Sequence, residues 1–193
     1  MVRVGVLALQ GAFIEHYEFL KKFDFVEPYL VKKREDLDKV NGLIIPGGES
    51  TTIGKLLERY EIKEFLKEKI KNGFPVFGTC AGLILLSKKI EQNYNQPLLE
   101  VLNVVIRRNA FGSQRESMEI DLDVKGFDKP FKGVFIRAPV VSEVGNGVEV
   151  LSSVDEGPVL VKEGNILGSS FHPELTDDIR IHKMFIDIIL KRR

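Results

Sequence analysis

One short segment, FPVFGTCAGLILL at residues 74–86, constrains the fold more than any other. It places the single cysteine, Cys80, between Gly78 and Gly82, after a short apolar run and before a helix-compatible run at 81–89. A sharp strand-to-helix turn with a nucleophile at its corner needs small flanking residues, because the backbone there is strained and closely packed. The start of the following helix would favour the thiolate form of the cysteine. The pattern fits a nucleophile and a buried structural cysteine equally well, since free cysteine is among the most buried residue types.

Length and composition are those of an ordinary globular protein. The chain has 193 residues, 44% hydrophobic and 29% charged, so we expect a single domain over residues 1–193. Lysine plus arginine and aspartate plus glutamate both number 28, which favours neither nucleic acid nor an anionic membrane as a partner. No apolar stretch approaches the roughly 20 residues of a membrane helix. One cysteine cannot form an internal disulfide, so we expect a reducing, cytoplasmic location.

The first half of the chain alternates strand-like and helix-like segments. Runs of β-branched and aliphatic residues end at Gly or Pro turns, and the segments between them carry apolar residues at helical spacing. This alternation predicts a mostly parallel sheet covered by helices on both faces. The expected strands span residues 2–9, 26–31, 42–46 and 75–78, and the expected helices span residues 12–23, 34–40, 50–59 and 62–71.

The pattern changes after about residue 102. Short apolar runs alternate with turns rich in Gly, Asp, Asn and Pro, which is typical of antiparallel strands. We therefore expect an antiparallel β extension in the C-terminal half, closed by an amphipathic helix at 179–190. The expected strands span residues 104–106, 118–124, 134–136, 148–154, 159–161 and 166–171.

A cysteine nucleophile needs a base and a group that orients the base, and the sequence offers one good candidate for each. His172 follows the last apolar run and is succeeded by Pro173 and Glu174. Proline biases the preceding residue toward an extended backbone, in which residues two apart project to the same side. Glu174 is therefore expected to bond one ring nitrogen of His172 and to leave the other facing Cys80. A His-Pro loop with an incidental carboxylate is the structural alternative.

The two other histidines, His16 and His182, lie in the first and last predicted helices. We interpret each of them as a surface histidine or a packing histidine whose polar atoms are satisfied. One cysteine and three dispersed histidines offer no metal-ligand spacing, so no metal site is predicted.

A tetrahedral oxyanion needs two preorganised hydrogen-bond donors. The backbone N–H of Ala81, directly after the cysteine, is one candidate. The turn PGGEST at 46–51 offers the second through Gly48, because glycine lets the backbone present its N–H to a ligand. A phosphate-binding loop is the rival interpretation of this turn, but the Lys-Ser/Thr ending of a nucleotide P-loop does not follow it.

Together these motifs resemble those of the class I (triad) glutamine amidotransferases, and most of all the glutaminase subunits of pyridoxal 5′-phosphate synthase. The cysteine elbow and His-Pro-Glu belong to the wider class, whereas Gly-Gly-Glu-Ser-Thr-Thr, Phe-Ile-Arg-Ala-Pro and Leu-Gln-Gly-Ala point to the subunit family. The resemblance implies a flavodoxin-like three-layer α/β sandwich, with a mostly parallel central sheet and an antiparallel β extension. It rests on LALQGA at 7–12, EH at 15–16, IPGGESTT at 45–52, GTCAGL at 78–83, NVV at 103–105, RNAFG at 108–112, GVFIRAP at 133–139 and SFHPEL at 170–175.

By position, the resemblance implies roles for individual residues. Cys80 would be the nucleophile, His172 the acid–base and Glu174 its orienting partner, with an oxyanion hole at Gly48 and Ala81. The implied glutamine-binding residues are Gly48, Glu49, Ser50, Arg108, Ile136 and Arg137. Without the resemblance, the two arginines would be interpreted as solvated surface residues.

One position departs from the family pattern. Where such subunits often carry Phe-Gly-Arg-Gln, this chain has Ser113 before Gln114. A role for a basic residue at position 113 is therefore in doubt, although Arg115 is a candidate to supply the charge.

The resemblance also implies an activity and a partner. Glutamine would be hydrolysed through a thioester, and ammonia would pass to a (β/α)8-barrel synthase subunit that makes pyridoxal 5′-phosphate. This chain would carry no cofactor, and Gln10 and Gly11 are candidate contacts with the partner. The alternatives are a γ-glutamyl hydrolase or cysteine peptidase on the same scaffold, and a binding module that has kept the fold without catalysis.

Overall fold

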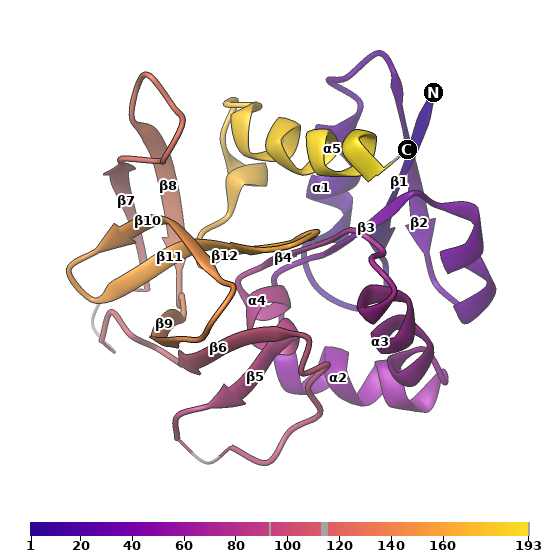
Figure 1. The fold of residues 1–193 in the computed structure, drawn as a ribbon, viewed down its shortest axis with the longest axis horizontal. Helices are drawn as coiled ribbons and strands as arrows, with labels where there is room; N and C mark the ends of the chain where they lie inside the picture. Colours follow the sequence, from indigo (N-terminus) through magenta and orange to yellow (C-terminus); the bar gives the residue numbers. More distant parts are fainter. Residues whose placement is uncertain (93, 113–115, 193) are drawn as a thin grey trace.

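The structure, a computed structural model, describes residues 1–92, 94–112 and 116–192. Within these residues the centre of the fold is a seven-stranded sheet (Figure 1). The strands from β2 to β12 pair in parallel, and β11 and β10 add an antiparallel edge. In spatial order the sheet consists of β10 (Glu149–Val154), β11 (Gly157–Glu163), β12 (Ile166–Ser169), β4 (Val76–Thr79), β3 (Gly42–Ile45), β1 (Val2–Leu7) and β2 (Val26–Val31).

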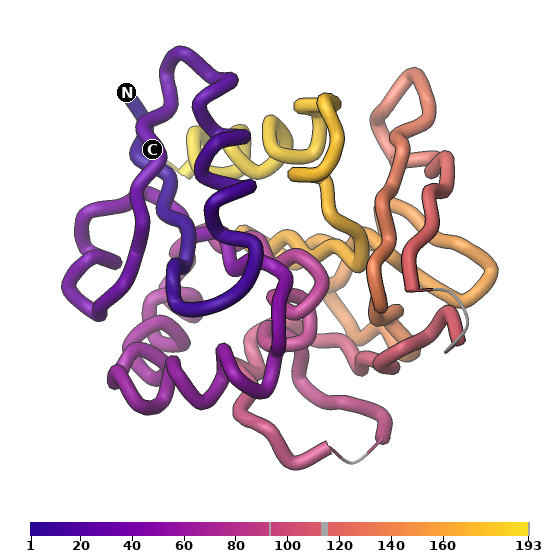
Figure 2. Tube along the Cα trace, turned by 180° about the vertical axis from the view of Figure 1, so that it is seen from behind, coloured from indigo at the N-terminus to yellow at the C-terminus, as the bar shows by residue number. Residues whose placement is uncertain are grey.

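Helices cover both faces of this sheet and make the fold a three-layer sandwich. The parallel strands follow the order β2-β1-β3-β4-β12, which is the flavodoxin-like arrangement. The expected fold class is therefore confirmed. In Figures 1 and 2, α1 (Phe13–Leu20) and α5 (Arg180–Arg192) lie side by side on one face, and α2 (Ser50–Arg59), α3 (Lys63–Lys71) and α4 (Ala81–Leu86) lie on the other.

The alternation of side chains along the strands produces two cores, one on each face. In β3, Leu43 and Ile45 pack into the core beneath α2, α3 and α4, whereas Ile44 packs into the opposite core. That second core contains Phe19 of α1 and Phe185 of α5. Both faces of these strands are buried, which explains why they are continuous apolar runs in the sequence rather than alternating ones.

The helix expected through residue 89 ends early. α4 stops at Leu86, and Ser87–Ile90 forms strand β5 instead. The Ser87 hydroxyl donates to the carbonyl of Ile84 at 2.7 Å, which ends the helix, and Ser87 then pairs with Leu102. Pairing with a distant strand therefore overrides the local helical preference of this apolar segment.

Two smaller sheets complete the fold, and the sequence had indicated only some of their strands. The pairs β6–β9 and β7–β8 are antiparallel, as expected, whereas β5 pairs with β6 in parallel. The sequence analysis did not predict β5 or β9. β9 begins directly after Pro139, the last residue of the motif at 133–139. The sheets are β5 (Ser87–Ile90), β6 (Leu102–Arg107) and β9 (Val140–Val144), and β7 (Ser117–Leu122) with β8 (Phe131–Ile136).

Other boundaries differ from the expected ones by a few residues. β1 ends at Leu7 rather than residue 9, and α1 ends at Leu20, after which residues 21–23 form hydrogen-bonded turns. The segment Arg34–Lys39 is a 3-10 helix, η1, held by the buried carboxylate of Asp36. Across the described ranges, no helix is both long enough and apolar enough to cross a membrane.

Candidate active site

Three neighbouring parallel strands bring the candidate residues together at their carboxyl ends. Ser169 of β12 is in register with Thr79 of β4, and Ile45 of β3 is in register with Gly78. The chain therefore leaves the sheet at adjacent points to form the loops that hold His172, Cys80 and Gly47-Gly48. Ligands bind at this edge in open α/β sheets. The sequence motifs predicted each of these loops separately. The parallel register of the strands places the three loops side by side.

Cys80 occupies a strained corner between β4 and α4. Its backbone has φ 50° and ψ −103°, a conformation that L residues rarely adopt. A Cβ at Gly82 would collide with the Ile45 carbonyl oxygen, and one at Gly78 would lie 2.5 Å from the Gly82 carbonyl. Both flanking glycines are thus required by close packing, as the sequence indicated. The cysteine is only 8% exposed, and its Sγ lies 3.8 Å from the Ile136 carbonyl oxygen.

His172 and Glu174 contact each other as expected. The Nδ1 atom of His172 lies 2.7 Å from Oε1 of Glu174, and both residues are 7% exposed. The expected reason for this contact was wrong in part, because Pro173–Leu175 is a 3-10 turn, η2, rather than an extended segment. The His172 N–H donates to the Val134 carbonyl at 2.8 Å, which anchors the loop to β8.

The charges of this pair follow from burial and from its partners. Burial lowers the pKa of His172, but hydrogen bonds to Cys80 and Glu174 outweigh it and raise that pKa to about 10. Burial raises the pKa of Glu174, but the neighbouring His16 and the hydrogen bond from His172 bring it below its usual value. His172 is therefore a cation and Glu174 an anion at neutral pH. His172 carries a proton that it can deliver beside Cys80.

His16 and His182 extend this buried network. His16 Nε2 lies 3.4 Å from Glu174 Oε2, and His16 Nδ1 lies 3.0 Å from His182 Nε2. Both histidines are fully buried, so the surface interpretation was wrong and the packing interpretation was incomplete. A signal was present in the sequence: His16 continues the apolar stripe of Phe13 and Phe19, three residues from each.

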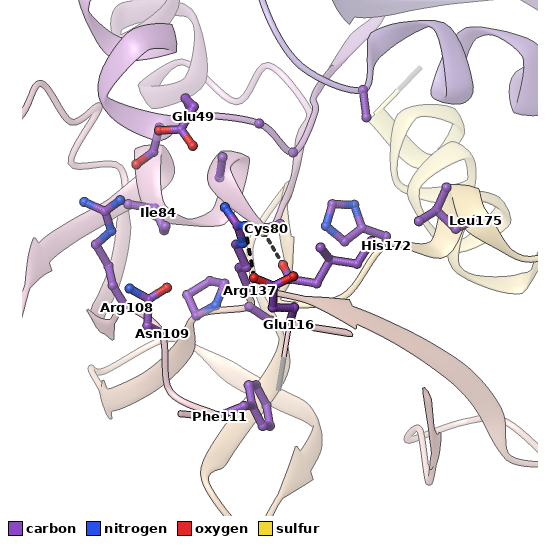
Figure 3. Close-up of a pocket in the computed structure, with 18 of the residues that line it drawn as sticks. Glu49, Cys80, Ile84, Arg108, Asn109, Phe111, Glu116, Arg137, His172 and Leu175 are labelled. Atoms are coloured by element: carbon purple, nitrogen blue, oxygen red, sulfur yellow. Dashed lines mark hydrogen bonds and ion pairs between the residues drawn. The ribbon is translucent and has the colours of Figure 1, made fainter. Parts of the chain in front are cut away.

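A cavity of about 810 Å³ opens beside Cys80. In Figure 3, Cys80 lies between His172 on one side and Glu49 and Arg108 on the other. The cavity brings together the nucleophile candidate and all six predicted binding residues. Its wall includes Gly48, Glu49, Ser50, Cys80, Ala81, Arg108, Ile136, Arg137, His172 and Glu174.

The glycine turn after β3 is held against the start of α1. The Ala12 N–H donates to the Gly47 carbonyl at 2.9 Å, and the side-chain oxygen of Gln10 accepts from the Glu49 N–H at 2.9 Å. A Cβ at Gly11 would collide with the Gly47 carbonyl oxygen. The predicted partner contacts, Gln10 and Gly11, therefore directly support the predicted oxyanion turn. Gly48 has φ 156°, a backbone conformation that residues other than glycine rarely adopt.

Two side chains that the sequence did not single out hold Arg108. The Arg108 guanidinium lies 4.4 Å above the Tyr94 ring and 3.5 Å from Oε1 of Gln96. That oxygen also accepts from the hydroxyls of Ser50 at 3.1 Å and Thr51 at 3.2 Å.

Arg137 is held differently, by an exposed ion pair with Glu116 at 3.4 Å. Its backbone has φ 45°, which is unusual for a residue other than glycine. Its side chain is 69% exposed, so on this side the cavity is open to solvent. The departure at Ser113, together with Gln114 and Arg115, lies outside the described residues.

The fold and the elbow geometry define the class of protein. A strained cysteine after a central parallel strand, with a His-Glu pair on the neighbouring strand, is the arrangement expected of a class I glutamine amidotransferase. A solved structure described as a glutamine amidotransferase superposes with a TM-score of 0.91 at 51% identity, covering 96% of this chain and 98% of that one. A putative GMP synthase component from Thermoplasma acidophilum shares the fold at 15% identity, with a TM-score of 0.71, covering 100% of this chain and 96% of that one.

The family follows from the whole sequence. The model of the SNO glutamine amidotransferase family matches residues 6–191, and the chain belongs to this family. Pyridoxal 5′-phosphate synthase subunit PdxT of Clostridium botulinum is 51% identical over 194 residues, with 100% of both chains covered. The subunit of the same name from Thermotoga maritima is 51% identical over 189 residues, covering 97% of this chain and 100% of the relative. The resemblance predicted from the motifs is confirmed.

Proposed function

We propose that the protein hydrolyses L-glutamine to L-glutamate and ammonia through Cys80, His172 and Glu174. The observation that carries the proposal is the assembly of these three side chains at the wall of one cavity. The Sγ thiolate attacks the side-chain amide carbon of glutamine, and the C–N bond of the tetrahedral intermediate breaks as His172 donates a proton to the departing ammonia. The remaining thioester is hydrolysed by water, whose proton returns to His172 as glutamate leaves.

The oxyanion of the tetrahedral intermediate would be held by backbone N–H groups of Ala81 and Gly48. Ala81 is the first residue of α4, so its N–H has no partner within the helix. The Gly47 carbonyl points toward Ala12, so the N–H of the same trans peptide, that of Gly48, points away from α1. A Cβ on Gly47 would lie 3.4 Å from the Cβ of Cys80, so this peptide adjoins the reacting sulfur.

The charged residues of the cavity suit an amino acid substrate. We assign the Arg108 guanidinium to the α-carboxylate of glutamine and the Glu49 carboxylate to its α-ammonium group, because each pairs with the opposite charge. Both residues line the cavity, as do Ser50, Ile136 and Arg137. Binding at both ends of the amino acid would place the side-chain amide at Cys80.

The ammonia would be delivered to a partner rather than released. The relatives from Clostridium botulinum and Thermotoga maritima are named as subunits of pyridoxal 5′-phosphate synthase. We infer that this chain docks on the corresponding (β/α)8-barrel synthase subunit and supplies ammonia for pyridoxal 5′-phosphate synthesis. Gln10 and Gly11 are our candidate contacts, since they touch the oxyanion turn and would transmit docking to it.

Replacing the nucleophile tests this function. The Cys80→Ala variant, co-purified with the synthase subunit, should release no glutamate from glutamine while keeping the wild-type thermal unfolding midpoint. Wild-type chain with and without the synthase provides the control, and γ-glutamyl peptides in parallel wells test the hydrolase alternative. Full glutaminase activity in the variant would overturn the mechanism. Preferential cleavage of γ-glutamyl peptides by the wild type would overturn the assigned substrate.

A further inference from the structure

A cluster of polar side chains lies in the apolar core behind Glu174. His16 of α1, Thr79 of β4 and His182 of α5 are all fully buried. Burial of polar groups costs free energy unless they are hydrogen-bonded. Two histidines in a core otherwise built from aliphatic and aromatic residues therefore carry a larger desolvation cost than apolar side chains of similar size. Their contacts indicate a role beyond packing.

The contacts form a continuous path from the core to the active site. His182 Nε2 lies 3.0 Å from His16 Nδ1, and His16 Nε2 lies 3.4 Å from Glu174 Oε2. The other carboxylate oxygen, Oε1, lies 2.7 Å from Nδ1 of His172. The hydrogen bond of His16 Nε2 is made with the Thr79 hydroxyl at 3.2 Å. Glu174 Oε2 has no hydrogen-bond partner among the described residues, so its approach to His16 Nε2 is an electrostatic contact. Each oxygen of Glu174 thus faces a different histidine.

The ionised carboxylate selects one arrangement of protons along this path. Nε2 of His16 must carry hydrogen, because an unprotonated nitrogen would direct its lone pair at the anionic Oε2. Nδ1 of His16 is then an acceptor, and Nε2 of His182 must be the donor to it. The remaining nitrogen, Nδ1 of His182, is left as an unprotonated acceptor without a partner among the described residues. The opposite arrangement would leave an unpaired buried N–H group there, which is rarer in proteins.

The rings in this path are held rigidly. Phe19 of α1 stacks on His182 with ring centroids 4.1 Å apart and an interplanar angle of 22°. Phe77 of β4 approaches the same ring edge-on at 6.1 Å. Aromatic contacts on two sides fix the plane of His182 and so the direction of its Nε2. α1, α5 and β4 together position a single hydrogen bond to His16.

We propose that His16 is a positioning residue for the reaction proposed above: its Nε2–H group holds Oε2 of Glu174, and His182 maintains the tautomer of His16 that makes this possible. With Oε2 held, the Glu174 carboxylate cannot rotate away from His172, and the His172 ring keeps its second nitrogen toward Cys80. His16 touches neither glutamine nor the sulfur, so it acts only through Glu174. The proposal rests on the proposed function for its kinetic consequences, whereas the tautomers follow from the contacts and from the negative charge of Glu174.

The charges around His16 are consistent with a neutral ring. Burial lowers the pKa of His16, with Glu174 and Glu15 acting in the opposite direction and His172 in the same direction. Burial also lowers the pKa of His182 well below its usual value, assisted by His16 and by Lys22. A neutral His16 can accept from His182 through Nδ1 while its Nε2–H group faces the Thr79 hydroxyl and the Glu174 carboxylate.

Kinetics of three variants test the positioning role. His16→Leu removes the donor, His16→Gln keeps an amide N–H at a similar reach, and His182→Phe removes only the tautomer-setting bond. In complex with the synthase, His16→Leu should lower kcat about 10–100-fold, as expected when an outer partner orients a reactive group, with KM unchanged. His16→Gln should restore most of kcat, and His182→Phe should lie between wild type and His16→Leu. Wild-type kcat in His16→Leu, or equal losses in Leu and Gln variants, would overturn the proposal.

Two further measurements do not depend on glutamine hydrolysis. The chain has three histidines, so each imidazole signal in a ¹⁵N NMR spectrum can be assigned by its own variant. His16 and His182 should each show hydrogen on Nε2, and His16 protonated on Nδ1 alone would overturn the proposal. Cys80 is the sole cysteine, so its alkylation rate by iodoacetamide across pH reports on the His172 pair. That profile should change in His16→Leu and be restored in His16→Gln. If wild-type protein fails to hydrolyse glutamine, the proposed function fails while these measurements still decide the positioning role.

Discussion

The two sides of the Cys80 site are built in opposite ways. The inner side consists of Glu174, His16 and His182, which are held by α1, α5 and the strands and are 7% exposed or less. The outer side consists of Glu49, Arg108 and Arg137 on loops, where the Arg137 side chain is 69% exposed and paired with an exposed Glu116. The inner side is a set of short contacts in the core, and the outer side is a charged rim around a cavity.

This difference separates two tasks. Proton transfer requires fixed geometry between His172 and the sulfur, which rigid buried elements provide. Recognition of an amino acid requires charges that solvent can reach, because glutamine must enter and glutamate must leave. Inner-side substitutions should therefore change kcat, and outer-side substitutions should change KM. The oxyanion turn lies between the two, held by Gln10 and Ala12 at the start of α1.

The largest effect is expected from Glu174→Gln on the inner side. The amide keeps the shape of the carboxylate but no longer stabilises the imidazolium of His172, and its NH₂ group would face the Nε2–H of His16. Loss of the acidic member of a comparable triad costs on the order of 10⁴-fold in kcat. Steady-state glutaminase assays in the synthase complex should show a loss of this order with KM little changed. Glu119→Gln, an exposed carboxylate on β7 that does not line the cavity, is the matched control. A loss below about tenfold would contradict the assigned role of Glu174.

A smaller effect, on a different parameter, is expected from Arg108→Met on the outer side. Methionine retains much of the length but removes the charge assigned to the α-carboxylate. A hydrogen bond to a charged group contributes about 1.5–3 kcal/mol, so KM for glutamine should rise about 10–100-fold while kcat changes little. Arg59→Met, at the exposed end of α2, is the control and should leave KM unchanged. A fall in kcat at constant KM would contradict the assignment of binding to the outer side and of proton transfer to the inner side.

The smallest effect concerns stability in mild acid. Burial lowers the folded-state pKa of His16 and His182 below 6.5, so below pH 6.5 the unfolded chain binds protons that the folded chain does not. The free energy of unfolding should therefore fall as pH decreases from 6.5 to about 4.5, by up to about 1.4 kcal/mol per pH unit for each site. His172 opposes this trend near pH 6.5, because the unfolded ring is only partly protonated there while the folded ring, with its pKa raised to about 10, is fully protonated. Its contribution becomes small below about pH 5.5, where the ring is protonated in both states.

Urea unfolding midpoints measured across this pH range provide the test. In His182→Phe, the slope of the unfolding free energy against pH should decrease by the contribution of one histidine, because phenylalanine cannot be protonated. A surface replacement such as Lys22→Gln, which lies near His182 but is exposed, should leave the slope nearly intact. An unchanged slope in His182→Phe would show that the buried ring is protonated in the folded state.

Much of the site could be predicted because its signals are local in the sequence. Gly78, Cys80 and Gly82 mark a strained corner, and His172-Pro173-Glu174 places a base next to its orienting carboxylate. The alternation of apolar runs and helical stripes predicts the parallel sheet, and a parallel sheet brings the ends of its strands to one edge. These inferences need only short-range sterics and periodicity. They hold here, although Pro173–Leu175 forms a 3-10 turn rather than an extended segment.

What only the tertiary structure decided depends on contacts between residues far apart in the chain. Ser87–Ile90 became a strand because it pairs with β6, whatever its local preference for helix. Gln96 and Tyr94 support Arg108 from a segment without periodic pattern. His16 and His182, 166 positions apart, meet because α1 and α5 pack on the same face of the sheet. The sequence by itself predicted the candidate nucleophile, its candidate base and the edge of the sheet where they meet. The buried path behind Glu174 was decided by helix packing, because no local pattern specifies which two helices will share a face.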